Sequence, residues 1–193
     1  MFKLAVFDQD GVLVTTDALD DIAESLGKGN ESRSYTERLM AKQISLREVL
    51  VGKLAILENF SKEEVEKAMQ NIKYDPEAKE TIQELKRKGI KTMVVTGSDK
   101  IIAEHTKKIL GMDFAAYSDD KTTMEDIEKL NAVAKIVNEM GIDKKEVLAI
   151  GNAESDREIL TYAGKGLVVR PVQGIEKDFE EIKSLKEILN YVR

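Results

Sequence analysis

The fold is decided by residues 4–13, which read Leu-Ala-Val-Phe-Asp-Gln-Asp-Gly-Val-Leu. Four apolar residues predict a short strand buried on both faces, and it ends in two carboxylates, Asp8 and Asp10, followed by Gly11. Charge is costly inside a sheet, so we expect both acids at the C-terminal edge of the strand, where α/β sheets place their ligand sites. Neighbouring carboxylates repel unless a cation lies beside them, and a divalent metal is the natural candidate.

Strands and helices alternate along most of the remaining chain. Amphipathic stretches predict helices that end at Gly89, Gly111 and Gly141, and Asp75-Pro76 predicts a side-chain cap with proline at the first helical position. This alternation predicts an α/β fold, a Rossmann-like three-layer core with a mainly parallel sheet and helices on both faces. The predicted strands are residues 3–7, 91–95, 114–117, 147–150 and 166–169.

Residues 15–74 interrupt this alternation. Their apolar periodicity is helical, and Ser45 and Ser61 each begin a Ser-x-x-Glu capping box. An insertion of roughly 60 residues is far too long for an ordinary connection. We therefore predict two domains, an α/β core formed by residues 1–14 and 75–193 and a small helical cap formed by residues 15–74, which could close over the strand ends.

Bulk composition excludes several classes of protein. The chain has 193 residues, of which 42% are hydrophobic and 34% charged, as is typical of a soluble globular protein. A net charge of −6 without a basic stripe argues against nucleic acid, and no apolar run approaches the roughly 18 residues of a membrane span. No signal peptide is recognisable, and the absence of cysteine suits the cytoplasm. We expect a cytoplasmic monomer or homodimer whose partner is a small molecule, with no nucleic acid and no membrane.

Two further segments place polar residues at the ends of predicted strands. Residues 96–98, Thr-Gly-Ser, could cradle a phosphate against a helix start, or form a plain turn with an N-cap. Residues 151–156 end a strand in glycine and an acidic loop, for which an exposed capping turn is the alternative. Because parallel strands end at one edge, these groups could surround one ligand: Asp8, Asp10, Thr96, Gly97, Asn152 and Asp156.

Asp-x-Asp-Gly-Val-Leu at residues 8–13, followed by Val-Thr-Gly at 95–97, resembles the haloacid dehalogenase-like hydrolase superfamily. The resemblance spans essentially the whole chain, and the segment after the first motif is similar to the cap of phosphoserine phosphatases. It implies a Mg²⁺-dependent phosphomonoesterase acting on a small phosphorylated metabolite through an aspartyl-phosphate. Hard oxygen ligands without cysteine suit Mg²⁺ rather than zinc.

The resemblance also implies a role for each motif residue. Asp8 would be the nucleophile, and Asp10 the acid and base that protonates the leaving alcohol and then activates water. Thr96 and the N–H of Gly97 would bind phosphate oxygens.

A lysine forms the third motif of these phosphatases. Counting back from Gly141 favours Lys129 as the cation that faces Asp8 and the phosphate, with Lys135 as the next candidate and Lys121 as another. The alternative is that Lys129 is one more solvated lysine on a helix.

The fourth motif departs from the family pattern. The predicted metal ligands are Asp8, Asp10, Asn152 and Asp156, and Asn152 stands where the family usually has an aspartate. One negative charge is lost, and Mg²⁺ affinity should fall unless Glu154 or Asp156 compensates. A non-catalytic phosphate- or metabolite-binding relative is therefore the alternative to a phosphatase.

Two cap residues are candidates for substrate binding by resemblance to phosphoserine phosphatases. Asp17 stands where those enzymes bind the substrate ammonium, and Lys53, or Arg47 in another register, where they bind its carboxylate. Lys53 falls on an otherwise apolar helix face, so it either points into a cleft or reaches past packed side chains to solvent.

Two features remain, of which the first argues against a related reaction and the second is interpreted as structural. Dehalogenation by the same aspartate would need neither a phosphate cradle nor a second acid at position 10. The dipeptide Arg170-Pro171 is interpreted as closure and packing at the sheet edge.

Overall fold

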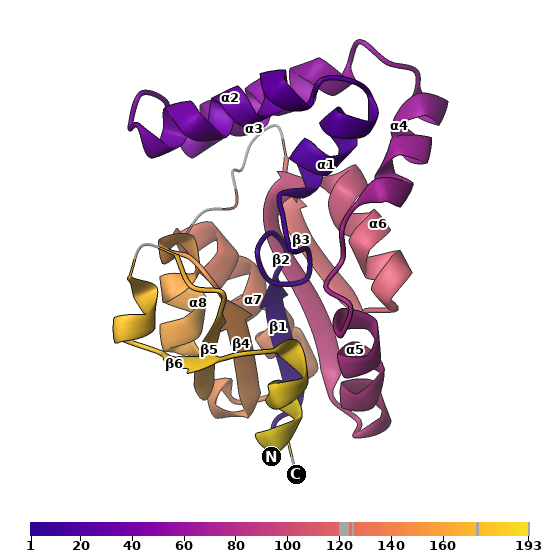
Figure 1. The fold of residues 1–193 in the computed structure, drawn as a ribbon. Coiled ribbons are helices and arrows are strands. Elements are labelled where there is room, and N and C mark those ends of the chain that lie inside the picture. The colour runs from indigo at the N-terminus through magenta and orange to yellow at the C-terminus, as the bar shows by residue number, and fades with distance from the viewer. Residues whose placement is uncertain (120–123, 125, 173, 193) are drawn as a thin grey trace. The chain divides into compact units, whose positions relative to one another are not determined.

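A six-stranded, wholly parallel sheet forms the centre of the larger unit in this computed structural model, which describes residues 1–119, 124, 126–172 and 174–192 (Figure 1). The strand order among the described residues is β3-β2-β1-β4-β5-β6, so the first strand lies near the middle. This confirms the predicted α/β fold class. The strands are β1 (Leu4–Asp8), β2 (Lys91–Asp99), β3 (Phe114–Ser118), β4 (Val147–Gly151), β5 (Lys165–Val169) and β6 (Glu180–Ile182).

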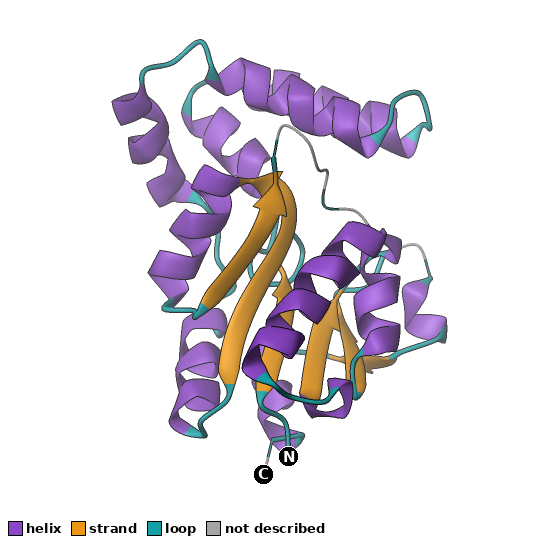
Figure 2. Cartoon of the chain, turned by 180° about the vertical axis from the view of Figure 1, so that it is seen from behind, coloured by secondary structure: helices purple, strands orange, loops and turns teal. Residues whose placement is uncertain are grey.

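Helices cover both faces of this sheet (Figure 2). Ala5 and Phe7 of β1 pack on one face with α5 and the 3₁₀ helix η5, whereas Leu4 and Val6 pack on the other with α7 and α8. Side chains alternate across a strand, so an unbroken apolar run supplies both cores at once. The helices are α5 (Ala78–Arg87), α6 (Lys100–Leu110), α7 (Asp126–Met140) and α8 (Arg157–Tyr162), with the 3₁₀ helices η2 (Lys144–Glu146), η3 (Glu154–Asp156), η4 (Ile175–Lys177) and η5 (Leu185–Asn190).

Three local predictions differ from the structure. β2 continues four residues beyond the predicted end because Asp99 pairs with Ser118 of β3, so residues 96–98 are extended and form no plain turn. α5 begins at Ala78 and not at Pro76, because the Asp75 carboxylate accepts the Glu77 N–H and forms a turn before the helix. Strand β6 was not predicted, since Glu-Glu-Ile is too short and too polar to give a strand signal.

The second compact unit comprises Val14–Lys73, and the first comprises Met1–Leu13 with Tyr74–Arg193. Each boundary lies one residue from the predicted one. The predicted capping boxes are present at Ser45 and Ser61, where each hydroxyl accepts the N–H of the glutamate three residues later. The elements of this unit are α1 (Ala18–Ser25), α2 (Gly29–Met40), α3 (Leu46–Leu57), α4 (Lys62–Ala68) and η1 (Met69–Asn71). None of the helices that the structure describes is both long and apolar enough to cross a membrane.

Candidate active site

Strand register brings the three predicted motifs to one edge of the sheet. Asp8 is the last residue of β1 and pairs with Val95 of β2, so Thr96 lies one residue further along at the same edge. On the other side, Phe7 pairs with Ile150 of β4, which places Asn152 just beyond the end of that strand. The Asp8 side chain is nearly buried, with 7% of the residue exposed. The first motif therefore lies between the second and the fourth.

A tight turn follows Asp8. The N–H of Val12 donates to the Gln9 carbonyl at 3.3 Å, and Gly11 has a φ of 79°, a conformation that residues with a Cβ rarely adopt. A Cβ at Gly11 would lie 2.0 Å from Nδ2 of Asn152. Glycine is thus required on two grounds, and its absent side chain leaves room for the Asn152 amide beside the loop that carries Asp10.

Lys129 supplies the cation of the site. It lies in the first turn of α7 and is 3% exposed, and its Nζ donates to Asp8 Oδ1 at 2.8 Å and to Asp156 Oδ1 at 2.7 Å. Of the candidate lysines that the structure describes, Lys129 is thus the one whose ammonium contacts Asp8. Lys135 is exposed and pairs with Glu139 at 4.0 Å, and Lys121 lies outside the described residues.

Asp156 holds the fourth motif together. It is fully buried, and its Oδ2 accepts the N–H groups of Asn152 at 2.9 Å and Ala153 at 3.2 Å. A Cβ at Gly151 would lie 2.6 Å from the Asp156 Cβ, so only glycine fits at the end of β4. Both oxygens of Asp156 are engaged, one by this loop and the other by Lys129.

Burial and charge set the ionisation of the buried triad. Burial, with help from Asp156, raises the pKa of Asp8 to about 6, although Lys129 and the Gln9 N–H lower it. Burial would lower the pKa of Lys129, but Asp156 and Asp8 outweigh it and raise that pKa above its ordinary value. At neutral pH, Lys129 is an ammonium and Asp8 is mostly a carboxylate, which is the form a nucleophile needs.

Asp10 lies in the turn after Asp8 and is partly buried. Burial raises the pKa of the Tyr74 hydroxyl, and the negative charge of Asp10 raises it further. That hydroxyl is hydrogen-bonded to Thr106 at 3.1 Å. The surroundings of Asp10 in the core therefore include an aromatic hydroxyl, which sequence reasoning did not identify.

The second motif is held in an extended form. The hydroxyl of Thr96, which is 1% exposed, accepts the Ser98 N–H at 3.0 Å and keeps its own proton to donate. The carbonyl of Gly97 accepts the Ser118 hydroxyl at 2.6 Å, and that hydroxyl accepts the Met124 N–H at 2.8 Å. Ser118 was missed at the sequence level, because a serine at a strand end carries no distinguishing signal.

The donor atoms fit a hard divalent cation. Three carboxylates (Asp8, Asp10 and Asp156) and one ammonium (Lys129) give the site a formal charge of −2. Within the described part of the chain, no three His, Cys, Asp or Glu side chains form a group that could hold a metal by themselves. Asn152 would have to supply an amide oxygen beside the carboxylates. An all-oxygen set of this kind suits Mg²⁺, although the neutral Asn152 amide brings no negative charge where an aspartate would bring one.

The two predicted cap residues bind each other. Nζ of Lys53 lies 2.7 Å from Asp17 Oδ2 and 2.8 Å from Asp20 Oδ1, and Lys53 is 1% exposed. Burial opposes protonation, yet Asp17 and Asp20 raise the pKa of Lys53 above its ordinary value. Ser32 of α2 donates to Asp20, which links three helices. Asp20 and Ser32 were missed, although an acid one turn beyond Asp17 was a signal for a shared cation.

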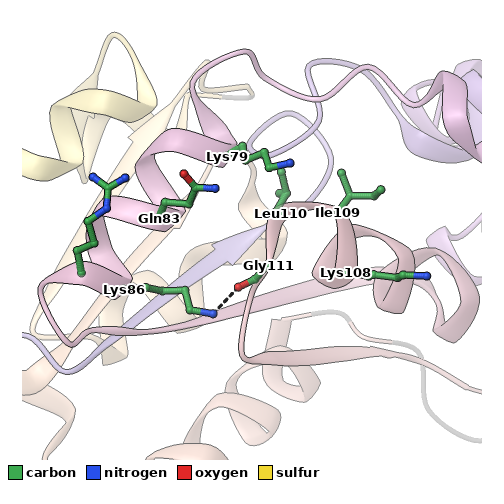
Figure 3. A pocket seen from close by; sticks show the side chains of 8 residues that line it. Lys79, Gln83, Lys86, Lys108, Ile109, Leu110 and Gly111 are labelled. Atoms are coloured by element: carbon green, nitrogen blue, oxygen red, sulfur yellow. Dashed lines mark hydrogen bonds between the residues drawn. The ribbon is translucent and has the colours of Figure 1, made fainter.

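A cavity of about 560 Å³ lies on the core between α5 and α6 (Figure 3). Its cations complement helix C-termini, since Lys86 and Arg87 lie in the last turn of α5 and Lys108 in that of α6. Nζ of Lys86 donates to the Gly111 carbonyl at 2.5 Å. The cavity contains none of the motif residues. It is lined by Lys79, Gln83, Lys86, Arg87, Lys108, Ile109, Leu110 and Gly111.

Comparison with known proteins gives consistent matches. The family model of haloacid dehalogenase-like hydrolases matches residues 2–164. The chain is 30% identical to a phosphoserine phosphatase of Methanocaldococcus jannaschii over 206 residues, covering 99% of this chain and 98% of that protein. It is also 30% identical to a phosphoserine phosphatase of Archaeoglobus fulgidus over 177 residues, covering 86% of this chain but 52% of that longer protein.

A solved structure described as a phospho-aspartyl intermediate analogue of phosphoserine phosphatase is similar over 100% of this chain and 99% of its own. The TM-score is 0.83 and the sequence identity is 26%. The similarity therefore covers the fold of the whole chain.

Proposed function

Because this chain belongs to the haloacid dehalogenase-like hydrolases and is a phosphoserine phosphatase-like phosphatase, we propose that it hydrolyses a small phosphomonoester through an aspartyl-phosphate on Asp8. The observation that carries the proposal is the pairing of a nearly buried Asp8 carboxylate with the Lys129 ammonium, at the edge where the Thr96 and Asn152 segments meet.

In the first half-reaction, a carboxylate oxygen of Asp8 attacks phosphorus and forms an acyl-phosphate bond while the bond to the alcohol oxygen breaks. Asp10 donates its proton to the departing oxygen, so the alcohol leaves neutral. Thr96 would donate its hydroxyl proton to a phosphate oxygen, and Lys129 would offset the charge that builds on the others.

In the second half-reaction, Asp10 is a carboxylate and takes a proton from water. The water oxygen attacks phosphorus, the bond to Asp8 breaks, and inorganic phosphate is released. Asp10 is then protonated again, and Asp8 is once more free to attack. One residue thus acts as acid and then as base, and both half-reactions use the same partners.

Repulsion between Asp8 and a phosphate dianion is the main obstacle, at about 4 kcal/mol per charge pair 4 Å apart in an effective dielectric of 20. Mg²⁺, when bound, would neutralise this charge and orient the phosphate. We propose that Asp8, the Asp10 carbonyl and Asn152 would hold it. Asp156 was also expected to bind the metal, but because both its oxygens are engaged we propose that it orients Lys129 and the Asn152 loop.

The proposed substrate is a small phosphorylated metabolite, and L-phosphoserine is the first to test because several relatives are named for it. In the cap of this chain, Lys53 is not free to bind a substrate carboxylate, since its ammonium is buried between two carboxylates of the protein. Phosphomonoesters without an amino acid group therefore belong in the same assay.

The experiment that tests the proposal is hydrolysis of p-nitrophenyl phosphate with Mg²⁺, followed by acid quenching and mass spectrometry. We expect turnover and one phosphoryl group on the peptide that contains Asp8. Asp8→Asn should abolish both, because a neutral amide cannot attack phosphorus, whereas Asp178→Asn, an exposed aspartate on the surface, should retain both. Full activity in Asp8→Asn would exclude the covalent mechanism.

A non-catalytic phosphate- or metabolite-binding function is the second candidate, and the observation that favours it is Asn152 in place of an acidic ligand. A folded protein that turns over no phosphomonoester with any of several divalent metals, but binds phosphate by calorimetry, would support this candidate over the phosphatase.

A further inference from the structure

Arg170, the first residue after β5, has an unusual backbone. Its φ is 48°, and among the described residues other than glycine only Lys42 shares a positive φ. A side chain makes this left-handed conformation unfavourable, so it persists only where surrounding contacts enforce it. Arg170 is therefore expected to make specific contacts with its surroundings.

All three nitrogens of the Arg170 guanidinium donate to core residues. Nε donates to the Gly11 carbonyl at 2.9 Å, Nη2 to the Val12 carbonyl at 2.5 Å and Nη1 to Asp75 Oδ2 at 2.8 Å. The planar guanidinium fork suits such a divergent set of acceptors, which a lysine could not satisfy at once. Asp75 is itself only 8% exposed, and Arg170 is its partner in a salt bridge.

The acceptors belong to two segments with special positions in the chain. Gly11 and Val12 directly follow Asp10, the proposed acid and base. Asp75 lies where the chain re-enters the core unit, and its N–H donates to the Leu13 carbonyl at 2.8 Å. Arg170 therefore holds the core side of both linkers to the helical unit, together with the turn that carries Asp10.

The same short loop also reaches the fourth motif. Two residues after Arg170, the N–H of Val172 donates to the Asn152 carbonyl at 2.8 Å. One loop of the structure thus contacts the backbone of the first motif, the backbone of the fourth motif and the returning linker. Closure and packing at the sheet edge, which the sequence indicated for Arg170-Pro171, would not require these particular acceptors.

We propose that Arg170 is a positioning residue for phosphoryl transfer, which fixes the Gly11–Val12 backbone and thereby the place of the Asp10 carboxyl relative to the departing alcohol. This inference rests on the proposed function. The specific consequence concerns protonation of the leaving group, because Asp10 is the residue that the clamped turn carries.

The test compares two substrates in Arg170→Met by kcat/KM, which reports the step in which the alcohol departs. An alkyl phosphate such as phosphoserine needs a proton on its leaving oxygen, and p-nitrophenyl phosphate needs one far less. We expect a fall of about 100-fold for the alkyl phosphate and of less than about tenfold for the aryl phosphate. Arg170→Lys should give a smaller fall with the same preference, and Arg87→Met, the loss of a surface arginine paired with Glu84, should change neither value.

Equal losses for both substrates, accompanied by a lower Tm, would mean a purely structural residue and would overturn the proposal. Hydrogen exchange gives a readout that does not need activity. Residues 9–14 and 73–77 should exchange faster in Arg170→Met than in the wild type, and at the wild-type rate in Arg87→Met. Unchanged exchange in Arg170→Met overturns the proposal whatever the kinetics.

If wild-type protein hydrolyses no phosphomonoester, the proposed function fails, and the exchange data alone decide whether Arg170 clamps the turn. Asp75→Asn, which removes only the charge partner, serves if Arg170→Met does not fold.

Discussion

At the scale of single residues, Asp8, Lys129 and Asp156 form a buried ion-pair cluster, in which removing one member would leave a buried charge without its partner. One carboxylate lies on each side of the ammonium, and all three groups are nearly or fully buried. The desolvation cost of such groups is large, and the mutual attraction offsets it only when the geometry is good. The residue that makes the cluster possible is therefore the lysine.

Lys129→Met should lower the free energy of unfolding by about 3–5 kcal/mol at pH 7, the usual cost of removing one partner of a buried ion pair. The pKa of Asp8 is already raised to about 6 with the lysine present, and it rises further without it. Asp8 then accepts a proton as the pH falls, so the loss should be smaller at pH 5. Urea denaturation with a chelator at both values measures this.

Lys135→Met is the matched control for Lys129→Met, because Lys135 is exposed and its pair with Glu139 is worth about 0.5 kcal/mol at most. A loss for Lys129→Met that did not change between pH 5 and pH 7 would contradict the assigned role of Asp8.

Asn152→Asp should raise Mg²⁺ affinity by roughly tenfold or more, because a hard cation binds an anionic ligand more tightly than an amide. Calorimetry of the resting protein measures this without any turnover. Glu154→Gln should leave the affinity unchanged, since Glu154 is an exposed residue paired with Arg157. An unchanged affinity in Asn152→Asp would remove residue 152 from the metal site.

At the scale of elements, the site depends on how strand ends are held in register. Asp113, just before β3, binds the start of β2: its carboxylate accepts from Lys91 at 2.9 Å and from the N–H and hydroxyl of Thr92 at 3.0 and 3.1 Å. Burial opposes ionisation, but Lys91 and Thr92 prevail and lower the pKa of Asp113 below its ordinary value.

Asp113→Asn should lower the free energy of unfolding by about 1–2 kcal/mol at pH 7, because hydrogen bonds to a charged acceptor are lost. A depressed folded-state pKa stabilises the protein above the ordinary value of 3.8, and that stability is lost as the pH falls through the folded-state pKa. The difference between wild type and variant should therefore shrink in acid. Chemical denaturation from pH 7 to pH 3 checks this, and a difference independent of pH would contradict it.

At the scale of the whole molecule, the chain forms two compact units. The core unit holds the candidate catalytic groups, and the helical unit is organised around a buried lysine shared by two aspartates. Units of this kind open independently, with stabilities that hydrogen exchange can resolve.

Lys53→Met should therefore destabilise residues 14–73 selectively. Removing the ammonium leaves Asp17 and Asp20 without their cation, at a cost of about 3 kcal/mol. Hydrogen exchange should rise across α1, α2 and α3, while β1 and β4 stay protected. Lys62→Met, the control, removes an exposed pair with Glu66 at 3.6 Å and should change little. Uniform loss of protection across both units would show that they unfold together.

The sequence by itself determined the parallel α/β core, the helical insertion and the three strand ends, because these follow from apolar periodicity, capping residues and motif spacing within short windows. Tertiary structure decided which of the 30 lysines and arginines are held in specific buried contacts. Spacing from Gly141 favoured Lys129 and an apolar helix face marked Lys53, but the sequence showed the contacts of neither, and Arg170 was interpreted only as packing at the sheet edge. Each acquires its role only where folding removes it from water against particular carboxylates or carbonyls, and that depends on contacts between residues 36, 121 and 159 positions apart.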